Sequence, residues 1–186
     1  MEGVLRLVTS RREKAEEARR LGFAVEQEPL ELPEPQSLDP SEIAAHKARA
    51  AWGLVGRPVV VEDSGLSIDA WGGFPGALVK WMEKSAGLAG MARMLDPFPD
   101  RAATARCALC FFDGSRLVEA LGECPGSIAA APRGTAGFGW DAIFIPEGHA
   151  RTFAELPPSE KDAVSHRGRA WMVLGERLGL RRRAEP

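Results

Sequence analysis

The stretch "ATARCALCFFDGSRLVEALG" (residues 103–122) predicts two strands joined by a tight turn. Residues 103–112 and 116–122 are apolar enough to lie in a core, and the Asp113–Gly114 pair between them is a strong hairpin signal. A hairpin joins antiparallel strands, so a sheet that contains it cannot be wholly parallel. This stretch therefore predicts a mixed sheet.

On both sides of the hairpin, short apolar runs alternate with segments of helical spacing. We expect further strands at 4–9, 23–28, 58–62, 127–131 and 142–145, and helices at 12–21, 41–54, 77–95 and 159–178. Asp39 and Pro40 are suited to begin the second helix, and Ser159 with Asp162 to form a capping box in the last. The order predicts an α/β protein with a long mixed sheet and helices on its faces.

Composition narrows the class of protein. The 186 residues suit one large domain or two lobes that share a cleft, and the net charge of −2 gives no reason to expect a nucleic acid or an anionic membrane as partner. No apolar run approaches the ~20 residues of a membrane span, and the N-terminal segment lacks the layout of a signal peptide. We expect a cytoplasmic protein. The basic end, residues 181–186, is expected to be solvated.

Three cysteines, an odd number, argue against a disulfide framework. Cys107 and Cys110 form a C-x-x-C, but residues three apart on a strand point to opposite faces. We therefore expect these thiols to pack in the core and not to bind a metal.

The stretch "VVVEDSGL" (residues 59–66) places two carboxylates after an apolar run. We expect the strand to end at Glu62, with Asp63 beside it and a turn at Ser64 and Gly65. Ligands of α/β sheets gather at the carboxyl ends of strands, and adjacent carboxylates suit Mg²⁺. An acidic strand end exposed in a turn is the equally weighted alternative.

Cations on apolar helix stripes give a second clue. Lys47 shares a stripe with Ile43, Ala51 and Leu54, and Arg167 lies on the stripe of the last helix, with His166 beside it. Only five of the 24 basic residues are lysines, so each lysine is a candidate for a compact charge that arginine cannot supply. Inward cations need anions, which indicates a cleft for an anionic ligand.

Two further segments allow both a functional and a structural interpretation. In "GFGWDAIF" (residues 137–144), Phe138 and Trp140 could stack on a flat base or fill the core. The strand–turn–helix "LVTSRREK" (residues 7–14) could present helix N–H groups to a phosphate, but its turn has no glycine. Combined with the carboxylates and lysines, these segments are suited to a nucleoside phosphate.

At these residues the sequence resembles the inosine triphosphate pyrophosphatase family, over nearly the whole chain. "LPEPQ", "EIAAHKA", "VEDSGLSIDAWGGFPGALVKW", "APRGTAGFGWDAIFIPEG" and "TFAELPPSEKDAVSHRGRA" are similar to its blocks, in the same order. The resemblance implies hydrolysis of ITP, dITP or XTP to the monophosphate and pyrophosphate with Mg²⁺. It also implies an elongated fold with two lobes around a substrate cleft, one domain over residues 1–186, and a homodimer.

Residue roles follow from the same resemblance. Asp63 would be the general base, and Glu34, Glu62 and Asp63 would hold the metal. Substrate contacts would come from Thr9, Ser10, Arg11, Arg12, Glu13, Lys14, Lys47, Glu62, Asp63, Ser64, Lys80, Phe138, Gly139, Trp140, Asp141, Lys161, His166 and Arg167. Against the family's T-G-N-x-x-K turn, Ser10 and Arg11 replace glycine and asparagine. We expect Arg11 to turn to solvent and leave the phosphates to backbone N–H groups and Lys14.

The chemistry is consistent with these roles. Arg167 can donate to the O6 and N7 acceptors of hypoxanthine or xanthine, whereas adenine carries a donor at position 6. Two alternatives stay open at this point. One is a pyrophosphohydrolase for modified pyrimidine triphosphates, and the other is a non-catalytic module that binds nucleotides or RNA.

Overall fold

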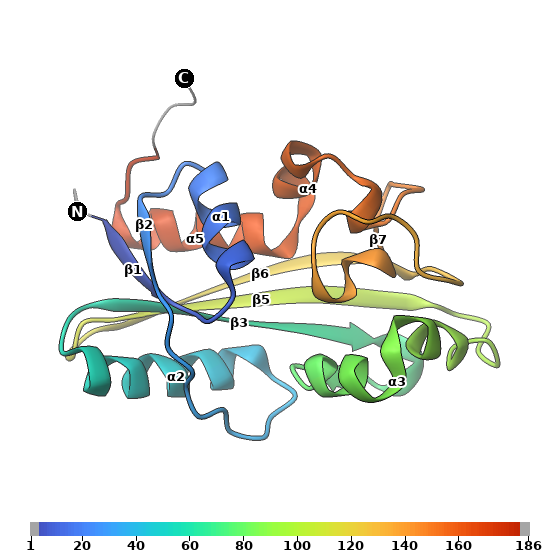
Figure 1. The fold of residues 1–186 in the computed structure, drawn as a ribbon, viewed down its shortest axis with the longest axis horizontal. Helices are drawn as coiled ribbons and strands as arrows, with labels where there is room; N and C mark the ends of the chain where they lie inside the picture. The colour runs from blue at the N-terminus through green and yellow to red at the C-terminus, as the bar shows by residue number, and fades with distance from the viewer. Residues whose placement is uncertain (1–3, 183–186) are drawn as a thin grey trace.

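The computed structural model describes residues 4–182, in which a seven-stranded mixed sheet carries helices on both faces (Figure 1). The helices are α1 (Arg12–Arg20), α2 (Pro40–Val55), α3 (Val79–Arg93), α4 (Pro158–Val164) and α5 (His166–Leu178). The strands are β1 (Leu5–Val8), β2 (Val25–Glu28), β3 (Val59–Ile68), β4 (Pro75–Gly76), β5 (Ala102–Phe112), β6 (Leu117–Ile128) and β7 (Phe144–Pro146). Short 3₁₀ turns are η1 (Asp69–Trp71), η2 (Gly139–Ala142) and η3 (Phe153–Glu155).

The sheet has the order β2-β1-β3-β5-β6-β7, with β4 on the free part of β3. β1 is parallel to β2 and β3, and the remaining pairs are antiparallel. The predicted hairpin is confirmed, because β5 and β6 pair from Phe112 and Leu117 at the turn to Ala102 and Ser127 at the far end. The predicted mixed sheet with flanking helices is therefore confirmed. The single domain with two lobes stays a prediction.

Helices α1, α4 and α5 lie on one side of the long strands, and α2 and α3 lie on the other (Figure 1). We call these the α5 side and the α2 side. On the α5 side, Trp171 and Leu174 pack with Leu109 of β5 in one buried cluster. On the α2 side, Ala48 and Ala51 pack with the first residues of β3. Leu54, predicted on the same inward stripe, is 68% exposed near the end of α2.

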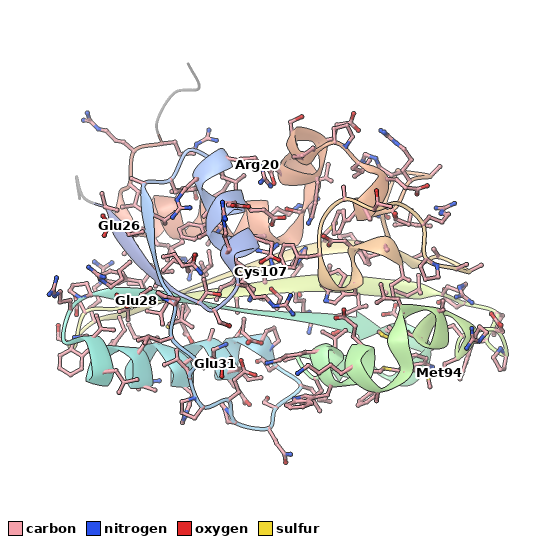
Figure 2. All side chains as sticks on the ribbon, in the orientation of Figure 1. Arg20, Glu26, Glu28, Glu31, Met94 and Cys107 are labelled. Atoms are coloured by element: carbon pink, nitrogen blue, oxygen red, sulfur yellow. The ribbon has the colours of Figure 1, made fainter. Side chains whose placement is uncertain are left out.

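The cysteines pack as predicted, within these two clusters. Cys107 belongs to the cluster on the α5 side and Cys110 to the cluster on the α2 side, and both thiols are free and buried. Figure 2 shows Cys107 near the middle of the sheet, below α1. None of the helices within residues 4–182 is both long and apolar enough to cross a membrane.

The predicted end of β3 is wrong, because the strand continues through Asp63, Ser64 and Gly65 to Ile68. Ten consecutive residues of β3 pair with β5, so the long hairpin strand supplies hydrogen-bond partners beyond the apolar run. Gly65 does not make a turn. A Cβ at this position would lie 2.9 Å from Ala77 N and 2.9 Å from the Gly76 carbonyl carbon, so glycine allows β4 to approach.

Three other elements also differ from prediction. The separate strands predicted at 116–122 and 127–131 form one strand, β6, which includes Pro125. Proline is tolerated there because its backbone groups face the β7 edge, where its carbonyl accepts from Glu147 N at 2.9 Å and β7 itself pairs only from Gly126 onward. The strand predicted at 142–145 begins later, at Phe144, after η2. The third helix, α3, is kinked at Gly87, where φ is 66°.

The last predicted helix is two helices. Ser165 has extended backbone angles, separates α4 from α5, and accepts a hydrogen bond from Gly168 N at 3.0 Å as the N-cap of α5. The predicted Ser159–Asp162 capping box does not form, because α4 begins at Pro158 with no side-chain cap. The Asp39 cap of α2 is confirmed, with Pro40 following it. Residues 183–186 of the predicted solvated end lie outside the described part.

Candidate functional site

The site is built on an open edge of β3. On this edge β3 pairs with β1 at Val60 and Val61 and with β4 at Leu66 and Ser67, so within residues 4–182 the segment 62–65 has no strand partner there. Successive side chains of a strand point to opposite faces. Glu62 therefore points to the α5 side and Asp63 to the α2 side, and both are reached across the same free edge.

Glu62 is the centre of the α5 side. Arg167 Nε donates to both of its carboxylate oxygens at 3.0 Å, and Lys14 Nζ lies 3.2 Å from Oε1. Ser64 also donates to Oε1, at 3.1 Å. Burial opposes ionisation of Glu62, but the charges of Arg167 and Lys14 outweigh it and lower its pKa to about 2. Glu62 is therefore a permanent anion at neutral pH.

Glu17 of α1 is a functional candidate that sequence reasoning missed. Its carboxylate contacts Arg167 Nη1 and accepts from Lys161 Nζ at 2.9 Å, and all three side chains are at most 5% exposed. Burial opposes ionisation of Glu17, but Arg167 and Lys161 together lower its pKa. The only sequence signal was the position of Glu17 beside the apolar stripe of α1 that contains Ala18.

Lys161 also joins this network to the loop before β7. Its Nζ donates to Asp141 Oδ2 at 2.6 Å, and the same oxygen accepts from Phe138 N at 2.8 Å. Burial raises the pKa of Asp141 despite the charge of Lys161. The Phe138 ring covers two cations, with its centroid 5.1 Å from Lys161 Nζ and 5.2 Å from Arg167 Cζ. Phe138 is thus the aromatic face nearest to the buried charges.

Trp140 and His166 lie deeper. Trp140 is 8% exposed and belongs to the apolar cluster around Phe144 and Phe153. His166 lies between Trp140 and Phe153, with ring-centroid distances of 5.1 and 5.9 Å. Neither imidazole nitrogen has a hydrogen-bond partner among the described residues, and burial together with the charge of Arg167 lowers its pKa well below 6.5. His166 is therefore neutral.

The α2 side has a simpler arrangement around one ammonium. Lys47 Nζ lies 2.8 Å from Glu34 Oε1 and 3.1 Å from Asp63 Oδ1, and Lys80 Nζ lies 3.8 Å from Glu34 Oε2. Burial opposes the charge of Lys47, but Asp63 and Glu34 outweigh it and raise its pKa. The pKa of Asp63 is raised because its burial outweighs the charge of Lys47. A carboxylate of raised pKa is suited to accept a proton.

The turn before α1 borders both sides. Thr9 is buried and accepts a hydrogen bond from Arg11 N at 3.1 Å, and Lys14 reaches Glu62 from the first turn of the helix. Arg11 is exposed, and Arg12 forms a surface pair with Glu16 at 2.6 Å. The structure therefore brings Thr9 and Lys14 to the site and leaves Arg11 and Arg12 on the surface.

The remaining predicted residues lie at the margins of the site. Ser10 is exposed beside Arg11, Glu13 lies on α1, and Gly139 begins η2 with φ at 59°. A cavity of about 200 Å³ adjoins the site between α1 and the start of α4. Its lining includes Glu13, Glu17, Phe138, Phe153 and Lys161.

The groups of the site that could hold a metal are its carboxylates. Within residues 4–182, no group of three or more histidine, cysteine, aspartate or glutamate side chains is arranged to hold a metal ion. Glu34 and Asp63 do converge on one point, and that point is occupied by Lys47 Nζ.

Fold and site together define an α/β protein with paired, largely buried charges on both sides of a free strand edge. The sequence profile of the Ham1 family matches residues 5–177. The chain is 42% identical over 152 residues to inosine triphosphate pyrophosphatase 1 of Trypanosoma cruzi, with 81% of this chain and 78% of that protein covered. It is 40% identical to the dITP/XTP pyrophosphatase of Thermococcus kodakarensis, over 89% of this chain and 92% of the relative.

A solved structure of a HAM1 protein from Coxiella burnetii has the same fold. It matches with a TM-score of 0.80 and 30% identity, and the match covers 95% of this chain and 98% of the other. The chain belongs to the Ham1 family.

Proposed function

We propose that this protein hydrolyses non-standard purine nucleoside triphosphates (ITP, dITP and XTP) to the monophosphate and pyrophosphate. The observation that carries the proposal is Asp63, a buried carboxylate of raised pKa at the free edge of β3, beside the ammonium of Lys47. A group that accepts a proton from water is needed for hydrolysis and not for binding. The names of the relatives, ITP and dITP/XTP pyrophosphatases, support the same substrates.

In this proposal the lysines at the strand edge bind the phosphates. Lys14, Lys47 and Lys80 carry ammonium groups near the edge, and Lys14 lies in the first turn of α1, whose free N–H groups favour anions. Asp63 orients the attacking water and takes its proton, and the water oxygen bonds to the α-phosphorus as pyrophosphate leaves.

The carboxylates suit Mg²⁺, which binds oxygen ligands and often takes one or two carboxylates plus substrate phosphates. Glu34 and Asp63 fit this donor set, because their oxygens already meet one cation, Lys47. Glu62 has less free capacity, since Arg167, Lys14 and Ser64 occupy its oxygens, so it would join only after Lys14 moves to a phosphate. When bound, Mg²⁺ would neutralise charge on the phosphates.

We place the purine base on the α5 side. Phe138 offers a ring for stacking. The guanidinium donors of Arg167 suit the O6 and N7 acceptors of hypoxanthine and xanthine, and they would reach the base by exchanging some of their present contacts with Glu17, Glu62 and Ser64. Adenine would place an N–H donor toward donors and leave them unpaired, which costs about 1–3 kcal/mol. In this arrangement Trp140 and His166 pack against each other in the core, next to the residues that bind the base.

The test is a panel of ITP, dITP, XTP, GTP, ATP and modified pyrimidine triphosphates with Mg²⁺, in H₂¹⁸O. We expect pyrophosphate as the first product, ¹⁸O in the nucleoside monophosphate, and rates on ITP far above those on ATP. Orthophosphate as the first product, ¹⁸O in pyrophosphate, or equal rates on ATP and ITP would contradict the proposal. Preferred hydrolysis of modified pyrimidines would support the alternative specificity, and tight binding without turnover would support a binding module.

We also propose that the protein is a homodimer that acts in the cytoplasm, where nucleoside triphosphates are held. Exposed apolar side chains support a partner surface near the start of α3, where Leu38, Phe74 and Trp81 are 48, 43 and 59% exposed. Light scattering coupled to size exclusion gives the mass directly, and a value of about 20 kDa, the mass of one chain, would contradict the dimer.

A further inference from the structure

Lys47 has an unusual position for a lysine. Its ammonium lies between the two carboxylates Glu34 and Asp63, at 2.8 and 3.1 Å, and only 11% of its side chain is exposed. The same carboxylates form the convergent oxygen pair that we assign to the metal under the proposed function. The position best suited to a cation is thus occupied by a cation that belongs to the chain.

We propose that Lys47 keeps the free protein from binding a divalent metal, and that metal and nucleotide therefore bind together. The inference rests on the proposed function and concerns the order in which the site is filled. An ammonium and a divalent ion repel each other, and only one of them can be the near neighbour of Glu34 Oε1 and Asp63 Oδ1. In the free protein, a metal that uses these two convergent oxygens must displace Lys47.

The displaced ammonium needs a new anionic partner. Because only 11% of the Lys47 side chain is exposed, leaving its ammonium unpaired inside the site is costly. The other carboxylates of the site already have cationic partners and cannot replace the lost ones. Glu62 is paired with Arg167 and Lys14, and Glu17 is paired with Arg167 and Lys161. A nucleoside triphosphate brings phosphate oxygens and supplies the missing partner.

Lys47 can make this exchange through its side chain alone. A lysine has a flexible four-carbon stem that ends in a point charge, so it can turn from carboxylate to phosphate without backbone movement. Once it turns, Glu34 and Asp63 regain free oxygens. Metal and nucleotide then each favour binding of the other, and this coupling is reciprocal.

The experiment measures Mn²⁺ binding to the nucleotide-free protein by electron paramagnetic resonance of unbound Mn²⁺. Lys47→Met removes the charge and keeps the approximate length of the side chain. We expect its Mn²⁺ affinity to be at least tenfold higher than that of the wild-type protein, which corresponds to ~1.4 kcal/mol. An affinity equal to or below wild type would overturn the proposal.

Two matched variants show whether charge at this position is the cause. Lys84→Met removes an exposed lysine of α3 that lies over Trp81, 5.0 Å from its ring centroid, and it should leave Mn²⁺ affinity unchanged. Lys47→Arg keeps the positive charge and should keep the weak affinity of the wild-type protein. A Lys47→Arg protein that binds Mn²⁺ as tightly as Lys47→Met would refute the charge argument.

A second measurement uses only the unmodified protein. The affinity for α,β-methylene-ITP is measured by calorimetry in EDTA and in excess Mn²⁺, and we expect it to be at least tenfold higher with the metal. Equal affinities would overturn the proposal even if Lys47→Met failed to fold. The Mn²⁺ titration needs no turnover, whereas the triphosphate panel measures turnover and tests the proposed function. Failure of the metal proposal can therefore be distinguished from failure of the proposed function.

Discussion

Replacement of Glu17 by glutamine tests the buried charge network most directly. Glu17 is the shared partner of Arg167 and Lys161, and the three side chains are at most 5% exposed. Glutamine keeps the shape and one carbonyl acceptor but removes the charge. Breaking a buried ion pair costs about 3–5 kcal/mol, and the retained acceptor recovers part of this, so we expect a loss of about 2–3 kcal/mol in the free energy of unfolding.

The assay is urea denaturation followed by tryptophan fluorescence, supported by thermal melting. For a chain of this length the expected loss corresponds to a decrease of roughly 5–10 °C in Tm. Glu16→Gln is the matched control on the same helix, because Glu16 pairs with Arg12, whose side chain is 81% exposed. Such a surface pair contributes at most about 0.5 kcal/mol. A Glu17→Gln protein within 0.5 kcal/mol of this control would refute the reasoning.

The dependence of this effect on pH has a defined sign. The pKa of Glu17 in the folded protein lies below its ordinary value of 4.5. The stabilisation that ionised Glu17 provides is therefore fully present above pH 4.5 and is lost as the pH falls through the folded-state pKa. The difference between the wild-type protein and Glu17→Gln should accordingly shrink in acid.

Three further predictions concern β3. Asp63→Asn should lower kcat on ITP by about 10²-fold or more while the variant still binds ITP. Steady-state kinetics measures kcat and a binding titration measures affinity, and an unchanged kcat would contradict the role of Asp63 as general base. The pKa of Glu62 falls from 4.5 to about 2 on folding, which corresponds to about 3 kcal/mol in the free energy of unfolding. This contribution is fully present above pH 4.5 and is lost as the pH falls through about 2. Unfolding titrations between pH 6 and pH 2 should show this loss, and a flat stability over that range would exclude it. Gly65→Ala should destabilise the folded protein by about 1–3 kcal/mol, because its Cβ would lie 2.9 Å from backbone atoms at β4. Gly53→Ala in α2, where a Cβ would have no atom within 4 Å, should stabilise the protein by up to ~1 kcal/mol. Equal melting temperatures of the two variants would contradict this contrast.

Much of the fold was predictable because its signals are local. The Asp113–Gly114 turn needs only neighbouring residues to specify a hairpin, and Asp39 with Pro40 specifies the start of α2 in the same way. The end of β3 was not predictable locally. Asp63 and Ser64 stay in the strand because β5, some 45 residues later in the chain, pairs with them.

The residues of the site likewise divide into those that a local sequence pattern predicts and those that depend on distant parts of the chain. Lys47 and Arg167 were recognisable as inward cations because they interrupt apolar stripes, and the structure gives each a carboxylate partner. Glu17 was missed because a glutamate on an amphipathic helix normally faces water. Its burial depends on Arg167, which lies 150 residues away in sequence. The break at Ser165, the N-cap of α5, places Arg167 in the first turn of that helix.

Because Glu62 and Asp63 are neighbours that point through opposite faces of one strand, the proposed tasks of the site are physically partitioned. Base selection belongs to α5 and the loop at Phe138, and water activation belongs to α2 and Glu34. The two halves are joined through the backbone of β3, whose register is fixed by its pairing with β5, and Lys14 acts on carboxylates of both halves. Substrate preference should therefore be open to redesign from the α5 side, by substitutions that leave the hydrolytic half and its geometry intact.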